Sequence, residues 1–408
     1  MALAAPAPGS GRFIAALVMA QVGVQTGAFT LPALLPGFMA RWEMSATEAG
    51  WLVGVFYLAY VPAVPVLVAL TDRLPARRIY LLGAGLTAVA HLGFALLAEG
   101  FWSALALRLL AGVGWAACYM PGLKALTDPV SGAAQSRAVS WHAAGVGIAG
   151  ALSFAAAGLL DALSGPEAAF LFGAATAATA FGLAAWAMPD AAPAAAPSGR
   201  RLLDFRPVLR NRRAMAWVVG YGVHTWELTA LRAWAVTFLA VTGARLGTPA
   251  WLPDPTVLFT LIGLACIAVS ITGNELAQRL GRARIVHWAM LSAAGFALVT
   301  GWAAGASVLL ALALLALWNA AIYLDSSALT AGTVQAADPA LRGATMGLHS
   351  MVGYTGGFLG PVGVGLLLDL GGGDSALGWG LAFGHLALLS LGGLLVLRRL
   401  APPLVRAG

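Results

Sequence analysis

The chain has 408 residues, of which 60% are hydrophobic and only 10% are charged, and its mean hydropathy is +0.85. A soluble domain of this length needs far more charge to cover its surface, so the composition excludes an ordinary water-soluble protein. The formal net charge of +7 does not indicate nucleic-acid binding, because the basic residues lie where membrane topology requires them.

The apolar residues occur in blocks of about 20 or more, each long enough to cross roughly 30 Å of hydrocarbon as a helix. We therefore predict an all-α integral membrane protein with twelve transmembrane helices. The predicted helices cover residues 13–36, 49–70, 79–98, 102–126, 138–161, 168–188, 214–241, 255–277, 285–303, 307–335, 343–369 and 378–397. The first block is too long for a signal-peptide core, so we expect it to be retained as a helix.

One long polar stretch, residues 189–213, separates the sixth predicted helix from the seventh. It begins with the Pro/Ala-rich run PDAAPAAAPSG and continues with the basic run RRLLDFRPVLRNRR. Such a composition is typical of a linker followed by an interfacial segment. We predict an N-terminal six-helix bundle (1–188), a cytoplasmic linker (189–213) and a C-terminal six-helix bundle (214–408).

The distribution of basic residues predicts the orientation. With a cytoplasmic N-terminus, 18 of the 23 Lys and Arg residues fall in cytoplasmic segments: Arg12, Arg73, Arg77, Arg78, Arg137, Arg200, Arg201, Arg206, Arg210, Arg212, Arg213, Arg279, Arg282, Arg284, Arg342, Arg398, Arg399 and Arg406. The opposite side holds only Arg41 and Arg245. We therefore expect a multi-pass protein of the bacterial inner membrane with both termini in the cytoplasm.

Two matched loops indicate an internal repeat. The loop DRLPARR after the second predicted helix resembles the run GNELAQRLGRAR after the eighth, which pairs Asp72 with Gln278. The loops after the fourth and tenth predicted helices open with Asp128-Pro129 and Asp338-Pro339. Both pairs lie about half a chain apart, as expected for parallel six-helix repeats.

These loops resemble the signature of the major facilitator superfamily, and so does the run from Arg108 to Gly114, which fits R-x-x-x-G-x-G. The Ser45–Trp51 segment before the second helix is also similar to that family. The chain departs from the pattern where Val68 and Pro75 replace glycines, and where Gln278 replaces the acid. The resemblance covers the whole chain and implies two six-helix bundles that move a solute by alternating access, in a functional monomer.

The charged loop residues are candidates for a gate. Asp72 lies beside several arginines at a cytoplasmic helix end, and contacts made there when that face closes must break when it opens. The predicted gating residues are Asp72, Arg73, Arg77, Glu275, Arg279 and Arg282. The alternative is an arginine cluster that only sets the topology.

Charged groups inside the predicted helices are costly, so each needs a partner or a wet cavity. Glu227 is the first candidate for proton coupling, because a carboxyl group buried at that depth can take up and release a proton. His224 lies one turn away and could share that proton, although a hydrogen-bonded core histidine is the alternative for it. The alternative for Glu227 is a static salt bridge to Arg232 or Arg108.

Two buried arginines would suit an anionic substrate, although Glu227 and Asp325 could neutralise them internally. Asn319 and Tyr323 share a face of the tenth predicted helix and are candidates for hydrogen bonds to a solute. The predicted substrate-binding residues are Gln25, Arg108, Tyr119, Arg232, Asn319, Tyr323 and Asp325. For Lys124, an interfacial pair with Asp128 is the favoured interpretation.

The sequence favours a proton-coupled secondary transporter of a small organic solute, with a slight preference for an anion. A drug/proton antiporter with a Trp-rich cavity is the alternative. An enzyme would need a nucleophile and base or a metal cluster near an interface, and the sequence offers neither. A channel is a further alternative, but two pseudo-equivalent halves with charges at one central depth suit a single closed site better than a continuous pore. The phosphate loop GxxxxGK[ST] is absent from the sequence, which argues against ATP-driven transport. We expect no cofactor, no metal and no nucleic-acid partner; the expected partners are the solute, a proton and the lipid bilayer.

Overall fold

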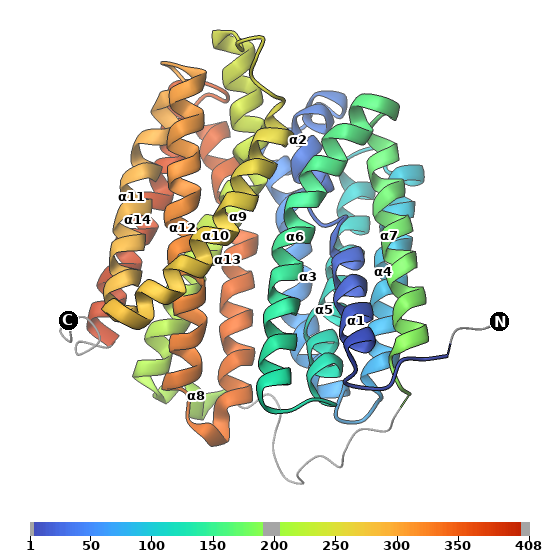
Figure 1. The fold of residues 1–408 in the computed structure, drawn as a ribbon. Coiled ribbons are helices and arrows are strands. Elements are labelled where there is room, and N and C mark those ends of the chain that lie inside the picture. Colours follow the sequence, from blue (N-terminus) through green and yellow to red (C-terminus); the bar gives the residue numbers. More distant parts are fainter. Residues whose placement is uncertain (1–3, 191–204, 401–408) are drawn as a thin grey trace. The chain divides into compact units, whose positions relative to one another are not determined.

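The computed structural model describes residues 4–190 and 205–400, which form α-helices and one short 3-10 turn without any strand (Figure 1). The helices are α1 (Gly11–Gln25), α2 (Thr30–Arg41), α3 (Ala46–Leu70), α4 (Ala76–Leu97), α5 (Phe101–Thr127), α6 (Gly132–Ser164), α7 (Pro166–Ala187), α8 (Arg206–Arg210), α9 (Arg212–Leu246), α10 (Pro255–Leu280), α11 (Arg282–Ala303), α12 (Val308–Ala336), η1 (Pro339–Leu341), α13 (Arg342–Leu370) and α14 (Ala376–Leu400). Most of the predicted linker, with Arg200 and Arg201, and the C-terminal Arg406 lie outside the described residues.

Eleven stretches of the described residues are long and apolar enough to cross a membrane, the first of which, Gly11–Arg41, comprises α1 and α2. The helix α9 is not among them, because His224, Glu227 and Arg232 lower its hydropathy. Its 35 residues extend over roughly 50 Å, which is more than a bilayer core requires. With α9 included, the described residues confirm the predicted all-α fold of twelve long helical segments.

The chain packs as two compact units. The first unit comprises Met1–Leu34 and Ala59–Leu202, and the second comprises Leu35–Leu58 and Leu203–Gly408. The second unit thus includes most of α2 and the first half of α3 in addition to α9–α14. The predicted domains 1–188 and 214–408 stay a prediction.

Short polar side chains define several helix starts. The Ser10 hydroxyl accepts a hydrogen bond from Phe13 N at 3.2 Å, and the Asn211 side chain accepts from Ala214 N at 3.1 Å. Each bond satisfies a backbone N–H that has no partner inside its own helix. These residues therefore set where α1 and α9 begin.

The start of α3 is capped twice. Ser45 and Glu48 form a reciprocal capping box, in which Glu48 N donates to the Ser45 hydroxyl at 3.2 Å and Ser45 N donates to Glu48 Oε2 at 2.9 Å. The carboxylate of Asp369, from the end of α13, accepts from Ala46 N at 2.9 Å and from Thr47 N at 2.8 Å. A negative charge at the positive end of a helix stabilises this arrangement within the second unit.

The first predicted helix, 13–36, is wrong in one respect, because the chain breaks between α1 and α2. Two groups at the break bond to other helices of the first unit. Phe29 N donates to the Ser153 hydroxyl at 3.0 Å, and Nε2 of His91 lies 2.9 Å from the carbonyl oxygen of Gly27. The apolar run predicted the span correctly, but the break depends on partners that are distant in the sequence.

Glycines bring α9 and α13 into direct backbone contact in the second unit. A Cβ atom added at Gly356 would lie 2.4 Å from the carbonyl oxygen of Gly222, and one at Gly360 would lie 2.3 Å from that of Trp226. No larger residue fits at either position, so the small side chains permit this close helix pair. The contact fixes the height and rotation of the charged middle of α9.

An aromatic core lies beside that charged region. Trp318, Trp379, Phe238 and Phe383 are all fully buried, and their rings contact one another with centroids 5.0–5.2 Å apart. Trp234 is also fully buried and donates from its indole N–H to the carbonyl oxygen of Pro361 at 3.0 Å. These side chains hold α9, α12, α13 and α14 together by packing.

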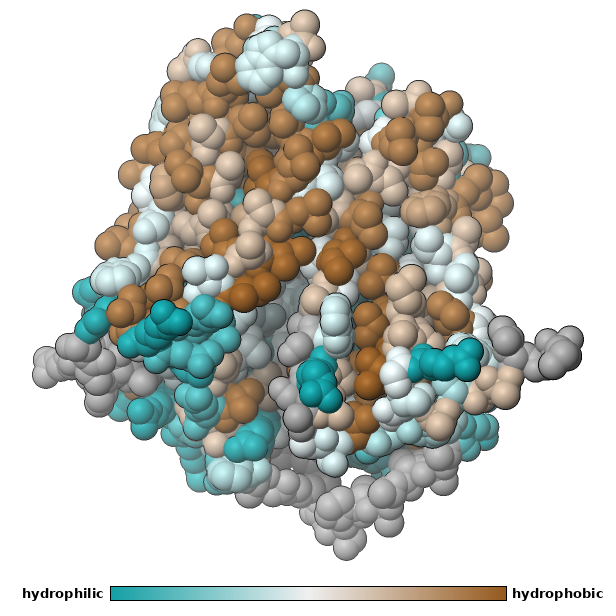
Figure 2. All heavy atoms as spheres, in the orientation of Figure 1, coloured by the Kyte–Doolittle hydropathy of each residue, from teal (hydrophilic) through white to brown (hydrophobic). Residues whose placement is uncertain are grey.

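On the face shown in Figure 2, apolar side chains cover the outer surface of α10, α11 and α12, as expected for helices that contact lipid. Hydrophilic residues gather at the end where α10 leads into α11. That end carries Arg279, Arg282 and Arg284, which the topology prediction assigns to the cytoplasm.

Candidate functional site

Glu227 is a buried acid with neutral partners. Its side chain is 3% exposed in the middle of α9. The indole N–H of Trp318 on α12 donates to Oε1 at 2.6 Å, and the hydroxyl of Ser390 on α14 donates to Oε2 at 2.9 Å. Among the described residues, no arginine forms an ion pair with Glu227, so the salt bridge considered for it is not present.

His224 pairs with a different acid. Its Nδ1 lies 2.8 Å from Oδ1 of Asp325 on α12, and both side chains are at least 95% buried. The two groups form an ion pair when the imidazole is protonated. The neighbouring helix thus supplies the contact of His224, and proton sharing between His224 and Glu227 stays a prediction.

A second histidine extends this arrangement. The ring of Tyr221 stacks on His349 with centroids 3.8 Å apart and on His224 with centroids 5.9 Å apart. Nδ1 of His349 lies 3.0 Å from the hydroxyl of Thr333. The buried titratable groups Asp325, His224 and His349 therefore lie in one continuous cluster, together with Tyr221.

Arg232 lies among tyrosines. It donates a hydrogen bond to the hydroxyl of Tyr323, and its guanidinium carbon is 5.7 Å from the centroid of that ring. Tyr57 and Tyr354, whose rings stack with centroids 5.9 Å apart, are near enough to interact electrostatically with Arg232. The site thus presents a fixed cation that contacts the hydroxyl group and lies beside the ring of Tyr323.

Asn319 faces α10 in the same unit. Its amide N–H donates to the sulfur of Cys266 at 3.3 Å, while its carbonyl oxygen is buried without a partner among the described residues. The second unit therefore brings together six predicted site residues: His224, Glu227, Arg232, Asn319, Tyr323 and Asp325.

The remaining predicted substrate residues belong to the first unit. Arg108 is 3% exposed and donates to the carbonyl oxygen of Ala28 at 3.4 Å, in the break between α1 and α2. The ring of Tyr119 lies 5.4 Å from that of His142. Gln25 is 3% exposed, and its amide nitrogen has no partner among the described residues.

The predicted gating residues of the first unit are dispersed around the loop after α3. Arg77 donates to the carbonyl oxygen of Ala185 at 2.8 Å, and Arg73 is exposed. Asp72 is half-buried and pairs with neither of these arginines in the described part of the chain. Its gating role stays a prediction.

The predicted gating residues of the second unit lie at the junction of α10 and α11. Glu275 and Arg279 are exposed, whereas Arg282 is half-buried and one of its terminal nitrogens is buried without a hydrogen-bond partner among the described residues. No contact here distinguishes a gate from a group that sets the topology.

Sequence reasoning missed several partners in the second unit. Ser390 is an isolated hydroxyl in an apolar helix, and nothing in its neighbourhood marks it as a ligand of Glu227. The sequence could have identified His349 as a candidate, because a histidine inside a membrane helix requires a polar partner. It does not show which residue that partner is. Tyr57 precedes α9 by more than 150 residues, so only the fold places it near Arg232.

Residues 17–361 match the family model of the Major Facilitator Superfamily. A stretch of 83 residues is 37% identical to the uncharacterized MFS-type transporter YwoD of Bacillus subtilis (strain 168), and this match spans 20% of the present chain and 18% of that protein.

Solved structures share the fold. The nucleoside transporter NupG, in a mutant form, superposes with a TM-score of 0.76 at 14% identity, covering 95% of this chain and 99% of that one. A bacterial homolog of the human lysosomal transporter Spinster gives 0.77 at 15% identity, covering 98% of each chain. A POT family transporter in complex with 5-aminolevulinic acid gives 0.79 at 13% identity, covering 97% and 98%.

The extent of the family match, the twelve long helical segments and the buried polar groups agree with one another. The chain belongs to the Major Facilitator Superfamily and is a multi-pass membrane transporter of the secondary type.

Proposed function

We propose that this transporter moves a small organic anion across the bacterial inner membrane by alternating access, and that Glu227 carries the coupled proton. The observation that supports the proposal most directly is the environment of Glu227, a buried carboxylate whose two oxygens accept hydrogen bonds, within residues 4–190 and 205–400, only from Trp318 and Ser390. Both donors are uncharged. Both termini are proposed to lie in the cytoplasm from the distribution of basic residues alone.

Charge energetics explain why this environment suits a proton carrier. An ionised carboxylate removed from water costs several kcal/mol unless a cation compensates it. Two neutral hydrogen bonds recover part of that cost, so Glu227 can exist in both protonation states. A proton taken up in the buried state would be released when water or a cationic group reaches the carboxyl group during the transport cycle.

Asp325 has a different role in this proposal. Its contact with His224 at 2.8 Å supplies a partner that can carry the opposite charge, so the pair can stay together through the cycle. Two acids in one unit with unlike partners are suited to different tasks, one to structure and one to exchange.

Arg232 supports the preference for an anion. Arginine stays charged in proteins and can bind a carboxylate or phosphate through two parallel hydrogen bonds. The tyrosines around it would add hydroxyl donors to such a solute. A similar structure holds 5-aminolevulinic acid, a small carboxylate, which supports the view that this fold accommodates a solute of that size.

A measurement of proton movement that accompanies solute transport tests the proposal. Purified protein would be reconstituted in liposomes with a trapped pH-sensitive dye and exposed to a panel of monocarboxylates, dicarboxylates, sugar phosphates and cationic dyes. A transported anion is expected to change the internal pH with wild-type protein. Glu227→Gln should reduce this change at least about tenfold, while exchange of the radiolabelled solute between the two sides persists.

The matched control is Glu99→Gln, which alters an exposed acid in the loop between α4 and α5 and should leave proton coupling unchanged. Full proton coupling in Glu227→Gln would overturn the assignment of that residue. A response to cationic dyes but to no anion would favour the drug/proton antiporter. Trp234 and Trp318 do not support that alternative, since both are fully buried in helix packing.

A further inference from the structure

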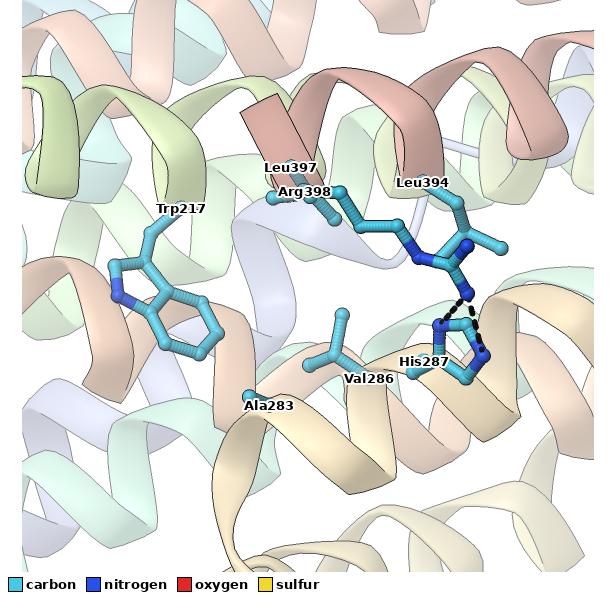
Figure 3. Close-up of a pocket in the computed structure, with 7 residues that line it drawn as sticks. All are labelled: Trp217, Ala283, Val286, His287, Leu394, Leu397 and Arg398. Atoms are coloured by element: carbon cyan, nitrogen blue, oxygen red, sulfur yellow. Dashed lines mark hydrogen bonds between the residues drawn. The ribbon is translucent and has the colours of Figure 1, made fainter. Parts of the chain in front are cut away.

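Two crevices, one in each unit, differ in size. The crevice between α9, α11 and α14 of the second unit has a volume of about 20 Å³, so it holds about one water molecule. Its two polar residues contact each other, because Nη2 of Arg398 lies 3.2 Å from Nε2 of His287 (Figure 3). The crevice between α3 and α5 of the first unit has a volume of about 180 Å³. Of the two, the α3/α5 pocket is the one with room for an organic molecule.

The α3/α5 pocket opens where both helices lose regular backbone hydrogen bonds. The helix α3 ends at Leu70, and α5 contains Pro121, which has no N–H to donate along the helix. The pocket is lined by Val68, Thr71, Met120, Pro121, Leu123 and Lys124. All six residues belong to the first unit.

The walls of the pocket are mostly apolar. Val68, Met120 and Leu123 are half-buried, so part of their hydrocarbon surface is accessible. The hydroxyl of Thr71 donates to the carbonyl oxygen of Val68 at 2.6 Å, so its proton is not available to a ligand. In another protein, an apolar cavity of about 150 Å³ takes up benzene. The α3/α5 pocket can therefore hold an apolar group about as large as a benzene ring.

The charged group of the lining is Lys124, the single lysine of the chain. Its Nζ donates to Oδ2 of Asp128 at 3.0 Å, and the two side chains are 37% and 58% exposed. An ammonium group has three donors, and a surface ion pair of this kind contributes little to stability. A second carboxylate can therefore bind Lys124 beside Asp128, or in its place, at a small cost.

We propose that the α3/α5 pocket binds a small monocarboxylate, with the carboxylate on Lys124 and a ring or short alkyl group against Val68, Met120 and Leu123. A dicarboxylate would place its second charge against apolar walls or beside Asp128, which is unfavourable. The thioether of Met120 favours an aromatic ring as the apolar part. The inference rests on the proposed function, because it identifies this ligand with the transported anion.

Acylation of the single lysine tests the proposal. Purified full-length protein in detergent would be treated with an amine-reactive ester, and peptide mass spectrometry would follow the labelling of Lys124 and of the N-terminal amine. Benzoate is the probe, because it carries one carboxylate on one ring. A bound benzoate shields Nζ, so a concentration of a few times Kd should slow the labelling of Lys124 about fivefold. The N-terminal amine should react at an unchanged rate.

Two related compounds separate the parts of the ligand. Benzamide has the ring without the charge, and acetate has the charge without the ring, so neither should protect Lys124 at the benzoate concentration. Equal protection by acetate would show a general ionic effect and refute the pocket. Stronger protection by palmitate than by benzoate would show a fatty-acid site and overturn the proposed class of ligand.

Val68→Phe fills the pocket without changing the charge and should abolish the protection by benzoate. Val66→Phe is the matched control, because Val66 is 52% exposed on the same helix and does not line the pocket. Leu123→Ala removes apolar contact without a clash and should weaken the protection, which keeps the test decisive if Val68→Phe does not fold. Full protection in Val68→Phe or in Leu123→Ala would refute the site.

Arg232→Gln separates this inference from the proposed function. The variant should lose anion transport but keep the protection of Lys124 by benzoate, because Arg232 belongs to the other unit. Loss of the protection in Arg232→Gln would mean that benzoate acts through the Arg232 site, which would refute a separate pocket. Protection of Lys124 in a protein that transports no anion would support the pocket and contradict only the proposed function.

Discussion

At the residue scale, the two buried acids of the second unit have different hydrogen-bond and ion-pair partners. Asp325 faces an imidazole, whereas Glu227 faces an indole and a hydroxyl. The two acids lie in facing helices, and each is about 3% exposed. Burial alone therefore does not distinguish them, and the assignment of proton exchange to Glu227 and of a structural role to Asp325 is a proposal that depends on their different partners.

The contact between His224 and Asp325 should act as a coupled pair. Removing one partner leaves an uncompensated buried group, so His224→Gln and Asp325→Asn are each expected to destabilise the protein by about 3 kcal/mol. The double variant should cost less than the sum, by about 1–3 kcal/mol. Chemical unfolding of the purified protein in detergent measures these values.

The exposed contact between Lys124 and Asp128, at 3.0 Å, provides the matched comparison. Such a surface pair one helical turn apart should show a coupling of about 0.3–0.5 kcal/mol. Additive effects of His224→Gln and Asp325→Asn would mean that the buried contact contributes nothing beyond its separate residues.

At the scale of elements, the break between α1 and α2 is the feature that departs most from the sequence prediction. Backbone groups leave the helical ladder there and bond to Ser153 on α6, to His91 on α4 and to Arg108 on α5. Irregular backbone within a membrane protein is tolerated only when it finds such partners. Arg108 thus contributes one hydrogen bond to the helix break of the first unit, and the substrate contact predicted for it stays a prediction.

Ser153→Ala tests this support. The variant removes the acceptor for Phe29 N, and a buried donor left without a partner costs about 1–3 kcal/mol. Ser153 itself is 1% exposed, so water cannot easily replace it. Thermal unfolding in detergent should show a clear fall in Tm. The control Thr179→Ala removes an exposed hydroxyl that bonds within its own helix, and it should leave Tm nearly unchanged. Equal Tm values for the two variants would contradict the proposed support.

At the scale of the whole molecule, the arrangement of positive charge predicts the orientation in the membrane. The basic residues concentrate on alternate loops, and only Arg41 and Arg245 lie on the side assigned to the exterior. Both native cysteines, Cys118 and Cys266, are buried, so the wild-type protein is a suitable blank for thiol labelling.

Cysteine labelling tests this orientation. Glu43→Cys and Arg137→Cys place exposed thiols on opposite predicted sides. A membrane-impermeant maleimide applied to right-side-out vesicles should label Glu43→Cys at once and Arg137→Cys only after permeabilisation. The reverse pattern would invert the topology, and labelling of both would contradict the assignment of the loops.

The sequence by itself determined the membrane class, the twelve long helical segments and the list of charged groups inside them. These properties are local, because about 20 consecutive apolar residues form a membrane helix whatever they pack against. The same reasoning identified Glu227, His224, Arg232 and Asp325 as the costly groups that demand an explanation.

Only the tertiary structure decided which of these groups meet. The pairing of His224 with Asp325, and the contact of Glu227 with Ser390, depend on the rotation and height of α9 against α12 and α14. Close backbone contact at Gly356 and Gly360 sets that position, and a shift of one residue would turn each side chain by about 100° around its helix. Helix register arises from many weak contacts between segments far apart in the chain. Hydropathy and motif spacing therefore do not predict which side chains of neighbouring helices contact one another.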